Sequence, residues 1–234
     1  MSHQGKKYLE AKALVTKESY LLDEAIALLK QVSKTKFDAT CEVHFRLNVD
    51  PKHADQNIRG TVSLPHGTGK EVRVIAFVDD AGVKKAKEAG AKEAGTAELI
   101  EKIEGGWLDF DVAVADPSQM KEIGKIAKIL GTKGLMPSPK AGTVTPDFEK
   151  AIQDIKKGKV EFRVDKLSNV HTVFGKISFD EAKLRENLLA VAKAIIEAKP
   201  ASIKGIYMKG ATLNPTMGPG IALDLNALTE EAKK

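Results

Sequence analysis

The segment His66-Gly67-Thr68-Gly69-Lys70 has the residue types of a loop that binds phosphate through glycine backbone N–H groups and a lysine. The complete pattern needs a glycine five residues before Gly69 and Ser or Thr directly after Lys70. Leu64 and Glu71 occupy these two positions, and strand-like sequence flanks the segment on both sides. A nucleoside triphosphate site is therefore not predicted here.

Cys41 is the only cysteine, and His44 or His171 could in principle activate it as a nucleophile. Cys41 alternates with the apolar Val43 and Phe45, which predicts that its thiol is buried, where most free cysteines are inert. His44 follows three residues later and therefore points to the opposite face of the strand. No grouping of His, Asp and Glu has the spacing of a metal site. The sequence thus predicts no catalytic residue, no metal site and no cofactor.

Three features carry residue types that suit a folded RNA. The loop at residues 216–220 lies between two predicted strands, and its glycines allow a backbone to approach a ligand closely. Residues 131–142 form a long, basic loop that two prolines stiffen. A cluster after a predicted helix contains Lys30, Lys34, Lys36 and Phe37. Lysines, glycine backbone and small hydroxyls read RNA by its phosphates, its shape and its 2′-hydroxyls, whereas the few aromatic residues do not predict a stacking platform.

Two kinds of strand pattern divide the chain. In residues 41–49, 160–164 and 170–179 apolar and polar residues alternate, which predicts strands buried on one face and paired antiparallel. Residues 72–78 and 112–115 are almost continuously apolar, which predicts strands covered on both faces by helices. We therefore predict a two-domain α/β fold. It combines a discontinuous α+β domain with antiparallel strands, built from both termini, and an inserted, doubly wound (Rossmann-like) α/β domain.

Helical spacing of apolar residues predicts amphipathic helices over residues 22–32 and 184–195. A further helix is predicted after Asp116-Pro117-Ser118-Gln119, where Asp can cap, Pro fits the first turn and Gln can complete a capping box. This helix presents Ile123, Ile126 and Leu130 at helical spacing, and Gly131 is predicted to end it.

The strand pattern changes near residue 65 and again near residue 158, which predicts a domain boundary at each point. The first domain is predicted to comprise residues 1–67 with 160–234, and the inserted domain residues 68–159. Two tandem domains are the alternative arrangement. Gly67, Gly69 and Gly158 stand at the two connections and are predicted to form a hinge, because glycine permits large backbone rotations.

The net charge of +5 is distributed unevenly between these domains. Residues 69–158 hold 15 Lys or Arg and 15 Asp or Glu, whereas the remainder holds 22 and 17. All of the excess positive charge therefore belongs to the two-ended domain, where we expect a polyanion to bind.

A domain with the inserted domain's predicted architecture could also bind a dinucleotide. The turn after its first strand reads Asp79-Asp80-Ala81-Gly82-Val83, without the spaced glycines of that site and with carboxylates where a pyrophosphate would lie. A nucleotide-dependent enzyme that uses the inserted domain is the alternative from another functional class.

The chain's 234 residues are 42% hydrophobic, which is enough to bury real cores and argues against wholesale disorder. A single cysteine excludes an intrachain disulfide and fits a reducing compartment. No run approaches the roughly 18 apolar residues of a membrane span, and the start MSHQGKKYLE lacks the apolar core of a signal peptide. We expect a soluble, cytoplasmic protein without a membrane partner.

Three motifs in order give the chain a specific resemblance. They read DQNIRGTVSLPHG at residues 55–67, ILGTKGLMPSPKAGTV at 129–144 and TMGP at 216–219. Together they are similar to the signatures of the family of the large-subunit ribosomal protein numbered one, of bacterial type. The similarity runs essentially from end to end of the chain.

The resemblance implies a ribosomal protein without enzymatic activity, monomeric when free, whose two-ended domain binds a folded region of large-subunit rRNA. It further implies that the protein forms the mobile side stalk, contacts exit-site tRNA to assist its release, and represses its own operon mRNA. By matching motif, the RNA-contacting residues would be Lys36, Phe37, Thr216, Met217 and Gly218. Phe37 and Met217 would pack against ribose, while the Thr216 hydroxyl and the Gly218 backbone would contact 2′-hydroxyls.

Overall fold

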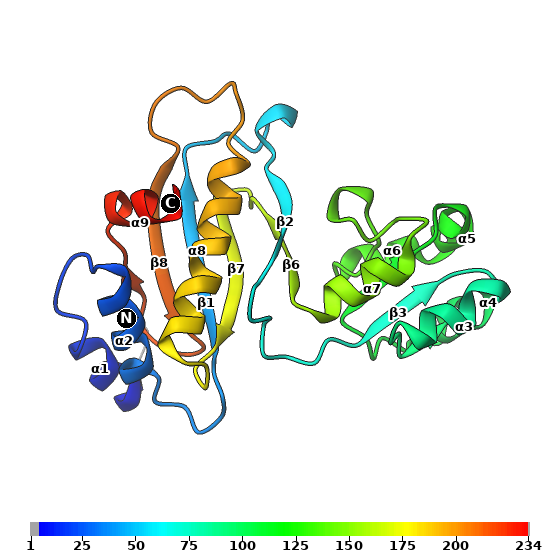
Figure 1. Cartoon of the computed structure of the whole chain (residues 1–234), viewed down its shortest axis with the longest axis horizontal. Helices are drawn as coiled ribbons and strands as arrows, with labels where there is room; N and C mark the ends of the chain where they lie inside the picture. The colour runs from blue at the N-terminus through cyan, green and yellow to red at the C-terminus, as the bar shows by residue number, and fades with distance from the viewer. Residues whose placement is uncertain (1–4, 234) are drawn as a thin grey trace. The chain divides into compact units, whose positions relative to one another are not determined.

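The computed structural model describes residues 5–233, and contacts between Cα atoms divide the chain into two compact units (Figure 1). Unit 1 consists of the residues up to Gly69 together with those from Val160 onward, and unit 2 runs from Lys70 to Lys159. These limits lie within two residues of the predicted domain boundaries. That each unit is an independent domain stays a prediction.

Unit 1 is built around an antiparallel sheet of four strands in the order β7-β1-β8-β9, beside a two-stranded sheet of β2 and β6. Its elements are α1 (Lys6–Ala13), α2 (Leu22–Val32), β1 (Thr40–Leu47), η1 (Ala54–Gln56), β2 (Arg59–Ser63), β6 (Lys159–Arg163), β7 (Asn169–Lys176), α8 (Glu181–Glu197), β8 (Met208–Pro215), β9 (Ile221–Ala222) and α9 (Leu225–Lys233). Strand β1 lies between β7 and β8 and pairs with both, so it is the centre of the sheet.

The one-sided burial predicted for β1 is confirmed. Cys41, Val43 and Phe45 are fully buried, whereas Glu42 and His44 lie on the other face and are partly exposed. Helices α2 and α8 cover the buried face, and Figure 1 shows α8 in front of the sheet, running along its strands. The predicted helix over residues 22–32 is confirmed, and α8 extends the predicted second helix at both ends.

Unit 2 contains a parallel sheet of three strands in the order β4-β3-β5. Its elements are β3 (Val74–Phe77), α3 (Asp80–Glu88), β4 (Glu93–Ala94), α4 (Ala97–Glu104), β5 (Val112–Ala115), η2 (Pro117–Gln119), α5 (Met120–Ile123), η3 (Gly124–Ile126), α6 (Ala127–Thr132), η4 (Pro139–Ala141) and α7 (Phe148–Lys156). Strand β3 is buried on both faces, because Ile75 and Phe77 join one apolar cluster and Val74 and Ala76 join another. The protein is thus a mixed α/β fold with antiparallel and parallel strands.

The helix predicted after Asp116 forms as a broken helical segment, η2-α5-η3-α6, which ends at Thr132. Asp116 caps it, since its Oδ1 accepts a hydrogen bond from Ser118 N at 2.8 Å. The capping box predicted for Gln119 is wrong, because the Gln119 side chain instead accepts from Thr96 Oγ1 at 3.0 Å. The break in the segment begins at Gly124, a poor helix former.

Within residues 5–233, none of the helices is both long and apolar enough to cross a membrane. Across the same residues, no group of three or more His, Cys, Asp or Glu side chains is arranged to hold a metal ion.

Candidate nucleic-acid interface

The loop between β8 and β9 is a tight turn that presents a methionine. Gly218 N donates to Pro215 O at 2.8 Å, which closes the turn, and Met217 between them has a φ of 65°. Left-handed backbone of this kind usually belongs to glycine, because a side chain there is strained. The Met217 residue is nevertheless 77% exposed, so packing within the protein does not explain its presence.

Thr216 ties this loop to the start of the central strand. Thr216 N donates to Thr40 O at 3.0 Å, and Thr40 N donates to Thr216 Oγ1 at 3.1 Å. The Thr216 hydroxyl also donates a hydrogen bond to Thr40 O at 3.3 Å. Its proton and one lone pair are therefore used within the protein, which leaves one lone pair for the predicted contact with RNA. Thr216 therefore positions the loop that carries Met217.

Gly218 occupies a place where no side chain fits. A Cβ atom there would lie 2.4 Å from Pro215 Cγ, far inside van der Waals contact. With the Asn214 amide turned so that its nitrogen faces the loop, that nitrogen donates to Gly218 O at 2.9 Å. The backbone around Gly218 is therefore held from two sides.

The second predicted element is the connection from α2 to β1, which carries Lys36 and Phe37. Phe37 is 55% exposed, and Thr35 Oγ1 donates to Phe37 O at 3.1 Å, so a local turn holds the ring in solvent. Lys36 is exposed in the same turn. The connection leads directly into Thr40, the residue to which Thr216 is bonded. The fold thus brings together two segments that are almost 180 residues apart in the sequence.

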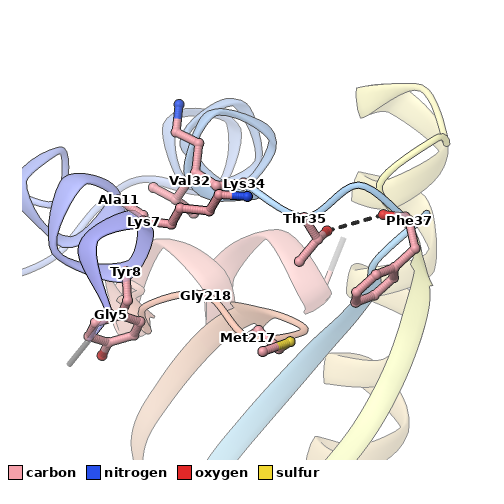
Figure 2. Close-up of a pocket in the computed structure, with 10 residues that line it drawn as sticks. All are labelled: Gly5, Lys7, Tyr8, Ala11, Val32, Lys34, Thr35, Phe37, Met217 and Gly218. Atoms are coloured by element: carbon pink, nitrogen blue, oxygen red, sulfur yellow. Dashed lines mark hydrogen bonds between the residues drawn. The ribbon is translucent and has the colours of Figure 1, made fainter. Parts of the chain in front are cut away.

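A groove of about 610 Å³ joins these two segments (Figure 2). Phe37, Met217 and Gly218 line it, whereas Lys36 and Thr216 are not among its lining residues. The other lining residues come from helix α1 with the residue before it, and from the end of α2 with the turn that follows, namely Gly5, Lys7, Tyr8, Ala11, Val32, Lys34 and Thr35. Two of the lining side chains are lysines and, among the described residues that line the groove, none is acidic.

Helix α1 is the part of this groove that the sequence did not predict. Ala11 is its only buried residue, so the helix lacks the apolar stripe that periodicity detects. The one usable signal is Tyr8, an aromatic residue directly after two lysines. Figure 2 shows Tyr8 across the groove from the turn that holds Phe37.

Most of the chain matches a known protein family. The model of the ribosomal protein L1p/L10e family matches residues 29–219, most of the chain. The chain belongs to this family. Its members are structural constituents of the large ribosomal subunit that bind rRNA in the cytoplasm, and they are not enzymes.

The matched region includes both segments of the interface, since it begins within α2 and ends at Pro219. Helix α1 lies outside the matched residues. The part of the groove that holds Phe37, Met217 and Gly218 therefore lies within the matched residues, and the wall formed by Tyr8 lies outside them.

The side chains that could have supported covalent catalysis are separated or disabled, in agreement with the ribosomal family. Burial raises the pKa of the Cys41 thiol to about 12, so it carries almost no thiolate at neutral pH. His44 and His171 lie on the other face of the sheet, with their Nδ1 atoms 2.9 Å apart. Burial, together with the neighbouring His171, lowers the pKa of His44.

The N-terminus of α3, where a dinucleotide would place its pyrophosphate, already holds a carboxylate. Asp79 Oδ1 accepts a hydrogen bond from Gly82 N at 2.9 Å. A Cβ atom on Gly82 would lie 3.1 Å from the Phe148 ring, so this glycine serves helix packing rather than a ligand. This arrangement disfavours the nucleotide-dependent alternative.

The predicted hinge glycines all adopt left-handed backbone, with φ values of 66° for Gly67, 72° for Gly69 and 106° for Gly158. Gly67 is fixed to unit 1, because the buried Asn187 donates to Gly67 O at 2.9 Å and accepts from His66 N at 3.0 Å. Any hinge on this connection must therefore begin after Gly67.

Proposed function

We propose that unit 1 binds a folded region of large-subunit rRNA through the turn at residues 35–37 and the loop at residues 216–218. The observation that carries this proposal is the groove that Phe37 and Met217 both line, because two exposed apolar side chains with lysines nearby suit ribose and phosphate together. Lys36 contributes charge beside the groove. The strained, tethered loop keeps Met217 in place before RNA arrives.

The net charge agrees with this assignment. Unit 1 holds 21 Lys or Arg against 17 Asp or Glu, whereas unit 2 holds 16 against 15. Binding to phosphates releases counterions and weakens with salt, so each lysine that contacts a phosphate contributes to the salt dependence of the affinity.

We further propose that the bound protein forms the mobile side stalk of the large subunit and assists the release of deacylated tRNA from the exit site. The same interface would bind the protein's own operon mRNA where that message imitates the rRNA site, and so repress translation. These proposals rest on family membership and on the expectation that one groove accepts two RNAs with the same fold. Gly69 and Gly158 would provide the hinge that lets unit 2 move.

Filter binding to the side-stalk fragment of large-subunit rRNA, over a series of salt concentrations, tests the interface. We expect Met217→Ala to lower the affinity at every salt concentration, and Lys36→Ala to lower the slope of log affinity against log salt by roughly 0.7 to 0.9. Ile206→Ala is the matched control for Met217, because Ile206 is equally exposed, at 75%. Wild-type affinity and slope in both Met217→Ala and Lys36→Ala would refute the assignment.

Competition with the operon leader tests the second RNA partner. Unlabelled leader mRNA should displace the rRNA fragment from the wild-type protein, and Met217→Ala should weaken both complexes in the same proportion. Failure of the leader to displace the rRNA fragment, or a directly measured leader affinity that Met217→Ala leaves unchanged, would mean that the message binds elsewhere.

A further inference from the structure

A second groove of unit 1, of about 890 Å³, lies between the loop before β8 and helix α9. Ligand sites in proteins have volumes of about 300 to 1,000 Å³, so this groove is large enough for one. The loop that carries Met217 follows β8, whereas this groove is at the other end of the strand (Figure 1). The eight residues of β8, at about 3.3 Å each, separate the two ends by about 20 to 25 Å. A partner in this groove therefore leaves the proposed rRNA interface uncovered.

The groove presents an apolar side chain to solvent. Ile206 lines it and is 75% exposed. Ile196 and Leu225 also line it, and both are partly buried against the core of unit 1. An exposed apolar surface that polar side chains surround is typical of a site where another molecule binds.

The backbone around Ile206 is held in place before any partner arrives. Asn48, the residue after β1, donates to Ile206 O through Nδ2 at 3.1 Å, and its backbone N donates to Tyr207 O at 2.7 Å. Lys199 Nζ donates to Gly205 O at 3.3 Å. Three successive carbonyl groups are thus fixed, so binding a partner orders little more than the Ile206 side chain and loses little entropy.

The polar rim of this groove is positively charged. Lys199, Lys209 and Lys233 line it and are exposed, and none of them forms an ion pair with a residue between 5 and 233. Glu230 is the one acidic residue among the described residues that line it. The rim therefore complements a partner that carries carboxylates.

A protein segment suits this groove better than an RNA. A phosphate backbone that follows the lysines would also meet the exposed carboxylate of Glu230, whereas no acidic residue is among the described residues that line the groove of Met217. A peptide avoids this repulsion, because it can place its carboxylates on the lysines and an uncharged group beside Glu230. It can also bury Ile206 against an apolar side chain of its own.

We infer that this groove is a docking site for a segment of another protein, which places an apolar side chain on Ile206 and flanking aspartates or glutamates against Lys199, Lys209 and Lys233. The apolar contact supplies most of the affinity, because ion pairs between exposed side chains contribute little. The lysines select an acidic partner and speed its association.

Selection of a phage-displayed library of random peptides on the full-length protein provides the probe for this site. We expect the enriched peptides to combine Asp or Glu with an aliphatic or aromatic residue. Fluorescence anisotropy of the strongest binder, labelled with a fluorophore, then measures the variants. Ile206→Asp should weaken binding about tenfold or more, because it removes the apolar contact and adds a like charge. K199Q/K209Q/K233Q should weaken binding about three- to tenfold and remove most of its salt dependence.

Each variant has a matched control in unit 1. Leu167→Asp replaces a side chain of equal exposure, 76%, and K6Q/K12Q/K166Q removes the same charge from exposed lysines that do not line this groove. Neither control should change the peptide affinity by more than about twofold. All four variants should keep the wild-type thermal midpoint, because only exposed side chains are replaced.

Two results would overturn the proposal. One is a selection whose best peptides lack carboxylates or bind Ile206→Asp as tightly as Leu167→Asp. The other is a triple variant K199Q/K209Q/K233Q that keeps the peptide affinity but lowers the salt dependence of binding to a short RNA duplex, which would make the groove an RNA site. Saturating peptide should leave the affinity for the side-stalk rRNA fragment unchanged. The docking site and the rRNA interface can therefore fail independently.

Discussion

Replacing Met217 by glycine should stabilise the fold while weakening RNA binding. The left-handed backbone at φ 65° costs a non-glycine residue about 1 to 2 kcal/mol, and glycine avoids this cost. Glycine also makes the unfolded chain more flexible, which lowers the free energy of unfolding by about 0.5 to 1 kcal/mol. Since the methionine is 77% exposed, little burial is lost, and we expect Met217→Gly to raise the free energy of unfolding by up to about 1 kcal/mol.

The effect of the same change on binding has the opposite sign. Full burial of a methionine side chain contributes about 1.5 to 3 kcal/mol, and most of this side chain is still available for an RNA partner. Its loss should cost about 1 to 2 kcal/mol of binding free energy, which raises Kd about five- to thirty-fold. Met217→Ala is the control, because alanine keeps the strained backbone and loses the same contact.

Hydrogen exchange at the amides of β1 should measure the stability, because β1 is the central strand of unit 1. Tryptophan fluorescence cannot replace it, since Trp107 is the only tryptophan and lies in unit 2. Fluorescence should therefore be unchanged by either substitution, which makes it an internal control. If Met217→Ala lowers the stability of unit 1 by more than about 1 kcal/mol, the side chain is packed in the protein and the reasoning is refuted.

Three further predictions follow from buried or paired polar groups. Asn187→Ala should lower the stability of unit 1 by about 2 to 4 kcal/mol, because three backbone groups lose their hydrogen-bond partner. Hydrogen exchange measures this loss, and a value below about 0.5 kcal/mol would contradict the anchoring of Gly67. Hydrogen bonds from Arg73, with Lys70 beside them, hold the pKa of Asp111 well below its usual range. The stabilisation of unit 2 by ionised Asp111 is complete above the unfolded pKa near 4 and is lost as pH falls toward the folded pKa. The free energy of unfolding of unit 2 should therefore fall less steeply in acid for Asp111→Asn than for wild type. Urea unfolding followed by Trp107 fluorescence measures this. Cys41 should resist iodoacetamide at pH 8 in the native protein and react once urea unfolds it, because burial raises the pKa of its thiol to about 12. Rapid labelling of the native protein would show instead that β1 opens.

The parts of the fold with a strong local period were predictable from the sequence. Apolar and polar residues alternate strictly in β1, and α2 has a wide apolar stripe. In each element the pattern predicts both the type of secondary structure and the face that is buried. The segment after Asp116 shows the limit of this reasoning. Its apolar residues have helical spacing and are buried as expected, but at the exposed Gly124 the helix tightens to 3₁₀ geometry. The Gln119 side chain accepts a hydrogen bond from Thr96 and does not form the predicted capping box.

The candidate site was predictable in its residues but not in its assembly. Motif matching pointed to Phe37 and Met217 separately, and nothing in their spacing showed that both would line one groove. That proximity comes from the pairing of β1 with β8, which sets Cys41 opposite Pro215 and so brings the two adjoining loops together. Helix α1 was not predicted, because it buries a single residue and so has no apolar periodicity. Only the structure shows that it forms a wall of the groove.

The hydrogen bonds around Met217 explain how a strained residue can hold one conformation. Thr216 is bonded to Thr40 through both its backbone and its hydroxyl, and Gly218 closes the turn onto Pro215. With both neighbours fixed, the only freedom left to Met217 is in its side-chain torsions, so binding RNA orders few bonds and loses little entropy. A loop anchored in this way favours recognition of an RNA that is already folded, because a rigid surface cannot reshape itself around a flexible strand. The same rigidity predicts that Thr216→Val, which removes the hydroxyl from Thr40, weakens RNA binding through the position of Met217 even though the methionine itself is unchanged.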